Sequence, residues 1–557
     1  MTAQDVATTV PDSTPMPPRK GAVARIGWLH VVAVEALIGA VLRGVALARP
    51  IDRLDRIFVP DDTYYTLSIA RSIAHGHGPT TDGQTLTSGF QPLVAFLLSP
   101  VFWLSDQPEV GLRANLVLLI ICDVAIIVLL AVIAYRIAGP VAAVVAGGVW
   151  AVSPAATRIA LGGLETSLAM LCEVALVAVW MWARDRPSTR RYVLVGVVAG
   201  LAILGRVDAV LLVALLVAVQ LWRGPRRPLA TIAASCAVTL APWWGYCLVQ
   251  FGSPIPASGS AAHALQPGDP LRPLMLSLSG SNALTGPFGA WTSFETRMAT
   301  QAQTWPFWVA LAVFVAGAGV LVAWSYRRPS GHTDVPSSRA FDLVCAATLP
   351  LFGAGLVVFY AWYNVIYYTY RYVAPAAMGM TLLVAWLIAT VGEVASRAGP
   401  TARRVATAVA VAVLIVVTAG PVVRGNRVVL RAKDAPRQPY DAATGYRDQA
   451  KAVNRIVPPD RTVGALQTGA LSYFLDGGRT ALNLDGVVNP DAYEARSDDR
   501  LGAYIQSQNV QWFADYALTI GSLWLELRRV DPTVRARVVR DLPGRPGMPT
   551  IRVAVIR

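Results

Sequence analysis

The chain has 557 residues, of which 54% are hydrophobic and only 15% are charged, and its formal net charge is +14. Soluble domains carry about 25% charged residues, so this composition excludes an ordinary soluble protein and indicates a polytopic membrane protein. The cysteines lie in apolar runs without metal-ligand spacing, and the sequence contains no P-loop, zinc signature or dinucleotide fingerprint.

Residues 1–25 begin the chain with a polar, proline-rich segment, which predicts a disordered N-terminus on the cytoplasmic side. A helix that crosses a membrane needs about 20 apolar residues, and on this criterion residues 26–423 are expected to hold about eleven transmembrane helices. The expected spans are 26–47, 112–133, 139–152, 164–182, 192–204, 207–222, 229–249, 305–324, 341–362, 372–391 and 405–422.

The apolar run 92–104 is too short for a clear crossing, and the loop charges decide its interpretation. If it does not cross, the arginine clusters at 184–191, 223–227, 327–328 and 403–404 all face the cytoplasm, as the positive-inside rule requires. We therefore expect a surface-lying or re-entrant helix there, with the N-terminus inside and the C-terminus outside.

With this topology, the external parts are the first loop 49–113, a short second loop around 162–165, a long loop 251–304 and a hydrophilic domain at 424–557. In that domain, short strand patterns alternate with helical patterns, which predicts a small α/β domain. The expected strands are 462–466, 480–484, 510–513 and 551–556, and the expected helices are 468–475 and 499–508. The predicted fold class is a mainly α polytopic membrane protein with a small C-terminal extracytoplasmic α/β domain.

Two adjacent carboxylates, Asp61 and Asp62, follow Pro60 after the first span, at the start of an amphipathic segment. An acid in this position is a good helix N-cap, although a cap needs only one of the two. A carboxylate at a membrane surface can also act as a general base that takes a proton from a hydroxyl group. Both interpretations stay open from the residues alone.

Three segments of the first external loop together resemble a known family: 61–65 (Asp-Asp-Thr-Tyr-Tyr), 76–78 (Gly-His-Gly) and 88–93 (Ser-Gly-Phe-Gln-Pro-Leu). They are similar to the first periplasmic loop of GT-C glycosyltransferases, in the bacterial branch related to protein O-mannosyltransferases and aminoarabinose transferases. The segments 467–473 and 483–486 resemble domains of actinobacterial members, and a composition rich in Ala, Val and Arg fits such a source.

This resemblance implies a GT-C fold and an inverting glycosyltransferase of the plasma membrane, with its active site and C-terminal domain on the extracytoplasmic side. The enzyme would move a sugar, mannose by family likeness, from a polyprenyl-phosphate donor to a cell-envelope glycan or lipoglycan. It implies membrane lipid but no nucleic acid as a partner, no cofactor, and no metal at the site. An arabinofuranosyltransferase that uses polyprenyl-phosphoarabinose is the alternative, and the acceptor, linkage, metal dependence and oligomeric state stay open.

Within this resemblance, Asp61 matches the catalytic base, and Asp62 stands where the family more often has Glu. Arg113 matches an arginine at the outer end of the second span that would face the lipid phosphate; its other interpretation is an interfacial arginine that snorkels. Glu165 matches an acid of the second external loop that would help to bind substrate, or it simply favours a helix N-terminus.

Two further arginines are expected near the donor phosphate. Arg206 and Asp208 lie where two spans meet, either as a phosphate-binding cation and a substrate ligand or as a structural pair. Arg371 lies among tyrosines that are also typical of an interfacial aromatic belt. The remaining residues expected to contact substrate are Tyr65, Gln91 and Tyr368.

Three acids, Glu35, Asp123 and Glu173, lie within predicted spans, where charged groups are costly and often functional. They raise a different hypothesis, an ion-coupled transporter or lipid flippase with a proton relay. The sequence shows no inverted repeat and no pair of broken helices, which disfavours transport. A receptor or scaffold is a third class, and the roles of the three acids stay open.

Overall fold

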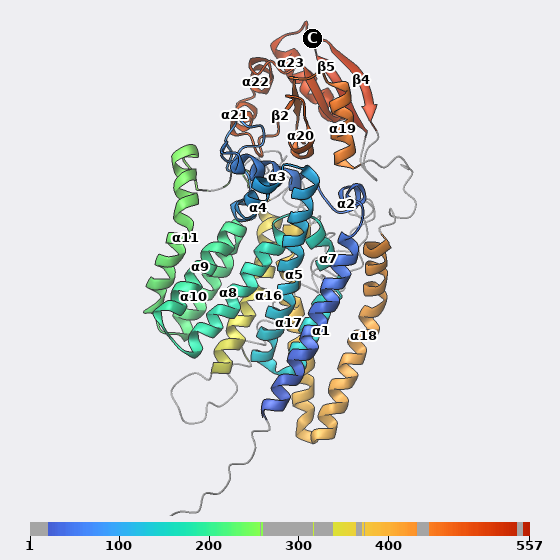
Figure 1. Ribbon diagram of the computed structural model, residues 1–557. Coiled ribbons are helices and arrows are strands. Elements are labelled where there is room, and N and C mark those ends of the chain that lie inside the picture. The colour runs from blue at the N-terminus through green and yellow to red at the C-terminus, as the bar shows by residue number, and fades with distance from the viewer. Residues whose placement is uncertain are drawn as a thin grey trace, which may run out of the picture.

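The protein is a helical bundle with a mixed α/β region at one end (Figure 1). The computed structural model describes residues 21–254, 338–363, 370–372, 374–431, 445–542 and 550–556, and the single positions 256, 258, 259, 316 and 323. The bundle contains α1 (Gly21–Leu47), α5 (Pro108–Ala138), α6 (Pro140–Ala151), α8 (Thr166–Asp185), α9 (Thr189–Gly205), α10 (Val210–Arg223), α11 (Pro228–Phe251), α16 (Ser338–Tyr363), α17 (Pro375–Ala395) and α18 (Pro400–Arg431). Shorter helices at the end near the α/β region are α2 (Ile51–Ile57), α3 (Asp61–Ala74), α4 (Pro92–Leu104) and α7 (Pro154–Leu161).

Seven of the described helices are long and apolar enough to cross a membrane, or eight if α6 and α7, which are bent by 53° relative to each other, form one span. These helices support a multi-pass membrane protein. The larger expected number is not confirmed, because α9 and α10 have only 17 and 14 residues. The expected span 305–324 lies outside the described residues.

The short apolar run forms α4 with the predicted bounds, and its 13 residues are too few for a span. Figure 1 shows α4 next to α3 at the end of the bundle that meets the α/β region. Its C-terminal residues Trp103 and Leu104 are 70% and 89% exposed, which suits an element at a membrane surface.

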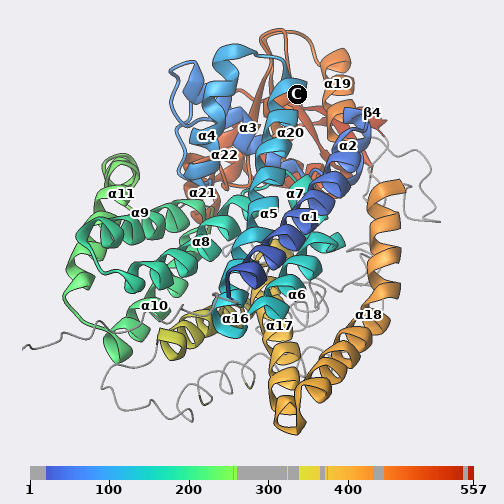
Figure 2. The same ribbon diagram turned by 60° about the horizontal axis from the view of Figure 1, so that its bottom comes forward.

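Small residues bring α16 and α17 close together. A Cβ atom at Gly353 would overlap Ala376 on α17, and one at Gly379 would overlap Pro350 on α16. Close backbone approach through small residues is how membrane helices gain packing contacts without a hydrophobic driving force. In contrast, α18 runs along the outside of the bundle with most of its valines between 405 and 423 exposed, as expected for a lipid-facing helix (Figure 2).

Two of the intramembrane acids have clear surroundings. Asp123 accepts hydrogen bonds from Arg43 Nε at 2.5 Å and Trp150 Nε1 at 3.1 Å, and both Arg43 and Asp123 are fully buried. Removing one member of such a pair typically costs about 3–5 kcal/mol, so this pair supports the packing of α1 on α5. Glu173 is also fully buried, but neither of its oxygens has a hydrogen-bond partner within the described part of the chain.

The C-terminal region contains a five-stranded sheet in the order β2-β1-β3-β5-β4. Strand β1 (Thr462–Ala465) is parallel to β2 (Thr480–Asn483) and β3 (Trp512–Tyr516), whereas β5 (Ile551–Ile556) is antiparallel to β3 and to β4 (Ala536–Leu542). The helices are α19 (Tyr446–Ile456), α20 (Gly469–Phe474), α21 (Pro490–Ser497), α22 (Leu501–Ser507) and α23 (Ala517–Val530).

The four expected strands all form, at or within a few residues of their predicted positions. Strand β4 was not predicted, because its residues are nearly all exposed on both faces and so lack the alternation of a half-buried strand. The predicted domain boundary at residue 424 lies inside α18 and stays a prediction.

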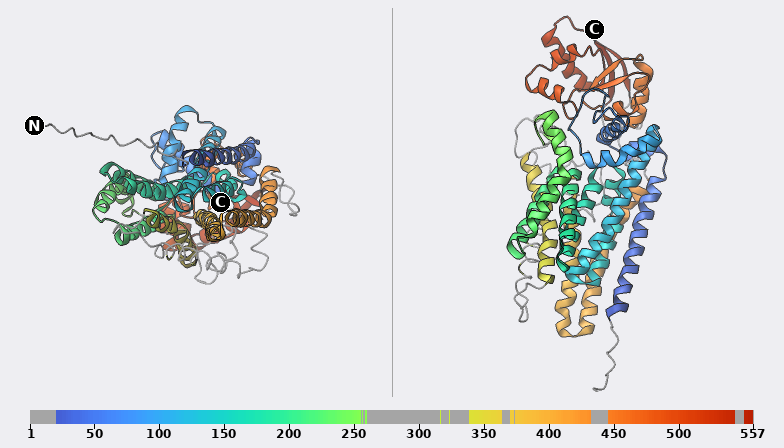
Figure 3. Two further views of the ribbon diagram at one scale, coloured as in Figure 1. Left: turned by 90° about the horizontal axis from the view of Figure 1, so that it is seen from below. Right: turned by 60° about the vertical axis from the view of Figure 1, so that its left-hand side comes forward.

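The α/β region rests on the first loop of the bundle, with α20 against α3 (Figures 1 and 3). Arg71 donates to the carbonyl oxygens of Ser472 and Tyr473, each at 3.2 Å, and its guanidinium lies 4.9 Å from the Tyr473 ring centroid. Tyr473 in turn donates to the Pro108 carbonyl at 2.8 Å. These contacts join the last third of the chain to the segment that carries the two adjacent aspartates.

Candidate active site

The two aspartates occupy the first two positions of α3. Pro60 before them is extended (φ −77°, ψ 164°), and no side chain caps the helix. Acids in a first turn are favoured by the helix dipole, which explains why both can stand there. The expected capping bond to their own helix is not formed, and the two side chains instead point to different partners.

Asp61 faces the C-terminal region and is only 6% exposed. Its Oδ2 accepts the Gly469 N–H and its Oδ1 accepts the Ala470 N–H, both at 2.8 Å. Burial raises the pKa of Asp61 to about 7, although the Ala470 N–H acts in the opposite direction. Both oxygens of this carboxylate are therefore engaged at the domain contact.

Five consecutive backbone N–H groups, at residues 466–470, have side-chain acceptors, the first two within the C-terminal region and the last three on α3. Asp515 accepts the first two, at 2.6 and 3.3 Å, and the Tyr65 hydroxyl accepts the third, from Thr468, at 2.9 Å. The last two go to Asp61. A Cβ atom at Gly469 would overlap the Asp61 carbonyl oxygen, so glycine is required for this close approach.

Tyr65 is thus part of the contact between α3 and the C-terminal region. Its hydroxyl also accepts a hydrogen bond from Asn483 Nδ2 at 3.2 Å. Burial, with the charges of Asp485 and Asp61, raises the pKa of Tyr65 above its ordinary value, so its hydroxyl keeps its proton.

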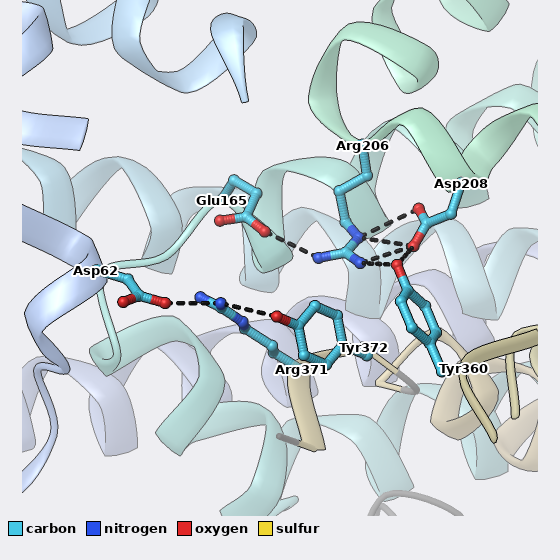
Figure 4. Close-up of polar contacts among 7 residues, drawn as sticks. All are labelled: Asp62, Glu165, Arg206, Asp208, Tyr360, Arg371 and Tyr372. Carbon is cyan, nitrogen blue, oxygen red and sulfur yellow. Dashed lines mark hydrogen bonds and ion pairs between the residues drawn. The ribbon is translucent and has the colours of Figure 1, made fainter. Parts of the chain in front are cut away.

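Asp62 points the other way, toward Arg371 (Figure 4). Its Oδ2 is 2.7 Å from Arg371 Nη2, and its side chain is 50% exposed. Arg371 also donates to the Tyr372 hydroxyl at 3.1 Å, and its Nε is buried without a hydrogen-bond partner in the described structure. This pair therefore offers an accessible carboxylate next to a cation with a free donor.

Arg206 lies beside this pair and is already surrounded by partners (Figure 4). It is 3% exposed and contacts Glu165 Oε1 at 2.8 Å and Asp208 Oδ2 at 2.6 Å. It also donates at 3.0 Å to the Tyr360 hydroxyl, which donates to Asp208 at 2.7 Å. The Tyr372 ring centroid lies 5.5 Å from this guanidinium and 5.0 Å from that of Arg371, so Tyr372 joins the two cations.

Of the remaining predicted residues, Arg113 and Gln91 have other surroundings. Arg113 donates to the carbonyl oxygens of Leu47 and Arg49, at 3.1 and 3.0 Å, and so holds the C-terminal end of α1. Gln91 occupies the N-cap position of α4 without a capping bond. Tyr368 lies outside the described residues.

The cluster in Figure 4 therefore unites Asp62, Glu165, Arg206, Asp208 and Arg371, all of which were predicted from the sequence. Tyr360 was missed because a single tyrosine at the end of an apolar helix carries no distinguishing pattern. Among the described residues, no group of three or more His, Cys, Asp or Glu side chains could hold a metal ion.

Residues 90–246 match the family model of dolichyl-phosphate-mannose-protein mannosyltransferases, and residues 437–544 match a domain of unknown function (DUF8728). No curated protein matches the sequence. Among solved structures, the oligosaccharyltransferase AglB from Archaeoglobus fulgidus, in complex with an inhibitory peptide and a dolichol-phosphate, is similar with a TM-score of 0.55 and 13% identity, over 89% of this chain and 70% of that chain.

ArnT from Cupriavidus metallidurans, bound to undecaprenyl phosphate, is similar with a TM-score of 0.52 and 15% identity, over 96% of this chain and 98% of that chain. The chain has the GT-C fold. The family match begins at Phe90, inside the first external loop, and includes Glu165 and Arg206 but not the two aspartates.

Proposed function

We propose that the protein is an inverting glycosyltransferase that moves a sugar from a polyprenyl-phosphate donor to an acceptor hydroxyl. The observation that carries the proposal is the half-exposed Asp62 carboxylate, 2.7 Å from an arginine whose Nε has no hydrogen-bond partner among the described residues. A base beside an unsatisfied cation is the combination that this transfer needs. The GT-C fold supports it, since both similar structures were solved with a polyprenyl-type phosphate bound.

In the proposed step, Asp62 takes the proton of the acceptor hydroxyl as its oxygen attacks the anomeric carbon of the donor sugar. The bond between that carbon and the phosphate oxygen breaks, and the polyprenyl phosphate leaves with the electron pair. Attack opposite the leaving group inverts the anomeric configuration, so no covalent enzyme intermediate is required.

Arg371 supplies the positive charge for the leaving phosphate. Charge-assisted contacts between guanidinium and phosphate are among the strong hydrogen bonds in proteins, and Arg371 Nε, which has no partner in the described part of the chain, is a donor for one of them. When the phosphate engages Arg371, the ion pair with Asp62 weakens, and the carboxylate becomes a better proton acceptor. Donor binding thus prepares the base.

The family resemblance assigns the base to Asp61, but the geometry supports Asp62 better. Asp61 is 6% exposed and each of its oxygens already accepts a backbone N–H group, so it is much less accessible to an acceptor hydroxyl than the half-exposed Asp62. We assign Asp61 to the docking of the C-terminal region on α3. Arg206, which is saturated by its partners, positions Glu165 and Asp208 for substrate contacts.

We place the active site on the extracytoplasmic side, with mannose as the donor sugar and a cell-envelope glycan or lipoglycan as the acceptor. The side follows from the positive-inside rule, since the α17–α18 turn near Arg403 and Arg404 lies at the opposite end of the bundle from the site (Figure 1). Mannose is favoured over arabinose because the family model that matches is that of mannosyltransferases.

The test is transfer by the purified protein in nanodiscs, with radiolabelled polyprenyl-phosphomannose or polyprenyl-phosphoarabinose as donor and mannan or arabinan oligosaccharides as acceptors. We expect mannose in the product, with the anomeric configuration opposite to that of the donor. Transfer of arabinose alone would correct the donor, and a product with retained configuration would contradict the mechanism.

A further inference from the structure

Asp485 lies at an edge of the C-terminal sheet that faces the first loop. It follows β2 by two residues, and β2 is parallel to β1, which is parallel to β3. The carboxyl ends of these strands therefore meet at one edge, which is where open α/β sheets usually bind ligands. The loop after β1 already contacts Asp61 and Tyr65 at this edge.

Two contacts hold the Asp485 loop against the loop that carries the active site. Asn483, which ends β2, donates to the Tyr65 hydroxyl at 3.2 Å, and Tyr65 lies on α3 one turn after Asp62. A Cβ atom at Gly89 would overlap the Val487 carbonyl oxygen, so these backbones touch. The position of Asp485 relative to Asp62 is thus set by a buried network.

The Asp485 carboxylate is only partly satisfied within the protein. Its Oδ1 accepts the Val487 N–H at 2.8 Å, the Asn483 side chain also hydrogen-bonds the carboxylate, and the Asp485 side chain is partly exposed. A carboxylate has about four acceptor sites, so acceptor capacity remains for a ligand beside these two partners. Burial raises the pKa of Asp485 to about 7, and the charge of Asp62 acts in the same direction as a smaller cause.

We propose that Asp485 is an acceptor-binding residue, whose carboxylate receives a hydrogen bond from a second hydroxyl group of the acceptor sugar while Asp62 deprotonates the first. Two neighbouring carboxylates repel an anionic acceptor, so this arrangement selects a neutral sugar with more than one free hydroxyl. The inference rests on the proposed glycosyl transfer. It gives the C-terminal region a direct part in choosing the acceptor.

The variants Asp485→Ala and Asp485→Asn test this role. Asparagine keeps an oxygen for the Val487 N–H and so preserves the loop, but it loses the charged acceptor. The matched control is Asp491→Asn, an exposed carboxylate on α21 in the same region. The assay varies a synthetic octyl mannoside acceptor at saturating polyprenyl-phosphomannose, with the arabinose pair in parallel, and also follows slow hydrolysis of the donor by water.

We expect the acceptor KM to rise about 10- to 100-fold in Asp485→Ala, and less in Asp485→Asn, because a hydrogen bond to a charged group is lost. The donor KM and the rate of donor hydrolysis should stay at the wild-type values, as should all parameters of the control. An unchanged acceptor KM, or donor hydrolysis that falls in parallel with transfer, would overturn the role of Asp485 but would leave the proposed glycosyl transfer standing. A wild type that transfers neither sugar would overturn the proposed function and, with it, this inference.

Discussion

Asp62 and Arg371 are separated by 309 positions in the chain and form an ion pair at 2.7 Å. The pair joins the start of α3 to the short helical turn at Tyr370–Tyr372, just before α17. It brings an accessible carboxylate and a cation with a spare donor to the same end of the bundle. The proposed chemistry depends on both, and each can be tested separately.

Replacing Arg371 with glutamine removes the positive charge while keeping a side chain of similar length. We expect kcat/KM for the donor to fall about 10- to 100-fold, because a charge-assisted contact to the phosphate is lost. The matched control is Arg397→Gln, an exposed arginine in the turn between α17 and α18. Equal values of kcat/KM for the two variants would contradict a contact between Arg371 and the donor phosphate.

We expect the main contribution of Arg206 to be to the stability of the folded protein. Replacing it with methionine leaves Glu165 and Asp208 buried without their cation, and breaking a buried pair in this way costs about 3–5 kcal/mol. The measurement is the midpoint of thermal unfolding in detergent, compared with Arg227→Met, which changes an exposed arginine before α11. A midpoint equal to that of the control would show that the Arg206 network contributes little to stability.

The sequence predicted much of this arrangement from local patterns. The apolar runs, the short helix at 92–104 and four strands were visible in the hydropathy pattern, and the paired aspartates were visible as a motif. The pattern could not show which aspartate faces the site. That choice depends on the N–H groups of Gly469 and Ala470, more than 400 positions away in the chain, which engage Asp61, whereas Asp62 pairs with Arg371.

Arg113 illustrates the same limit. A lone arginine at the end of an apolar span gives the same sequence pattern whether its side chain faces a phosphate or a backbone carbonyl. The structure gives it two carbonyl partners at the end of α1, and this contact is invisible in a pattern of residue types. In contrast, Arg206 and Asp208 are near neighbours in sequence, and the possibility that they pair could be stated in advance.

Gly469→Ala tests the close contact between α20 and α3. The added methyl group would overlap the Asp61 carbonyl, and overpacking of this kind typically costs about 1–3 kcal/mol. We expect a lower unfolding midpoint and faster proteolysis of the C-terminal region. Gly521→Ala on α23 is the matched control, because its Cβ would meet nothing within 4 Å. Equal protease resistance of both variants would contradict the docking role of this loop.

The docking contact should also depend on pH. The pKa of Asp61 is raised from 3.8 to about 7 in the folded protein, which therefore binds more protons than the unfolded chain between these values. The contribution of Asp61 to stability must then decrease as pH rises from about 4 to about 7, by up to about 1 kcal/mol per pH unit.

The measurement is the unfolding midpoint at several pH values, for the wild type and for Asp61→Asn. Asp485 and Asp515 have pKa values raised to about 7 and about 6 and titrate in the same window, so the difference between the two curves is the informative quantity. We expect a shallower decline in Asp61→Asn. Curves that run parallel would mean that the protonation of Asp61 does not affect the domain contact.

The most direct test of the proposed mechanism compares Asp62→Asn with Asp61→Asn in the transfer assay. Loss of a general base typically lowers the rate about 10²- to 10⁴-fold, and we predict this loss for Asp62→Asn with the unfolding midpoint unchanged. Asp61→Asn should keep transfer within about tenfold of the wild type and should instead loosen the C-terminal region. The opposite pattern, in which Asp61→Asn abolishes transfer with the C-terminal region still docked while Asp62→Asn stays active, would contradict the account.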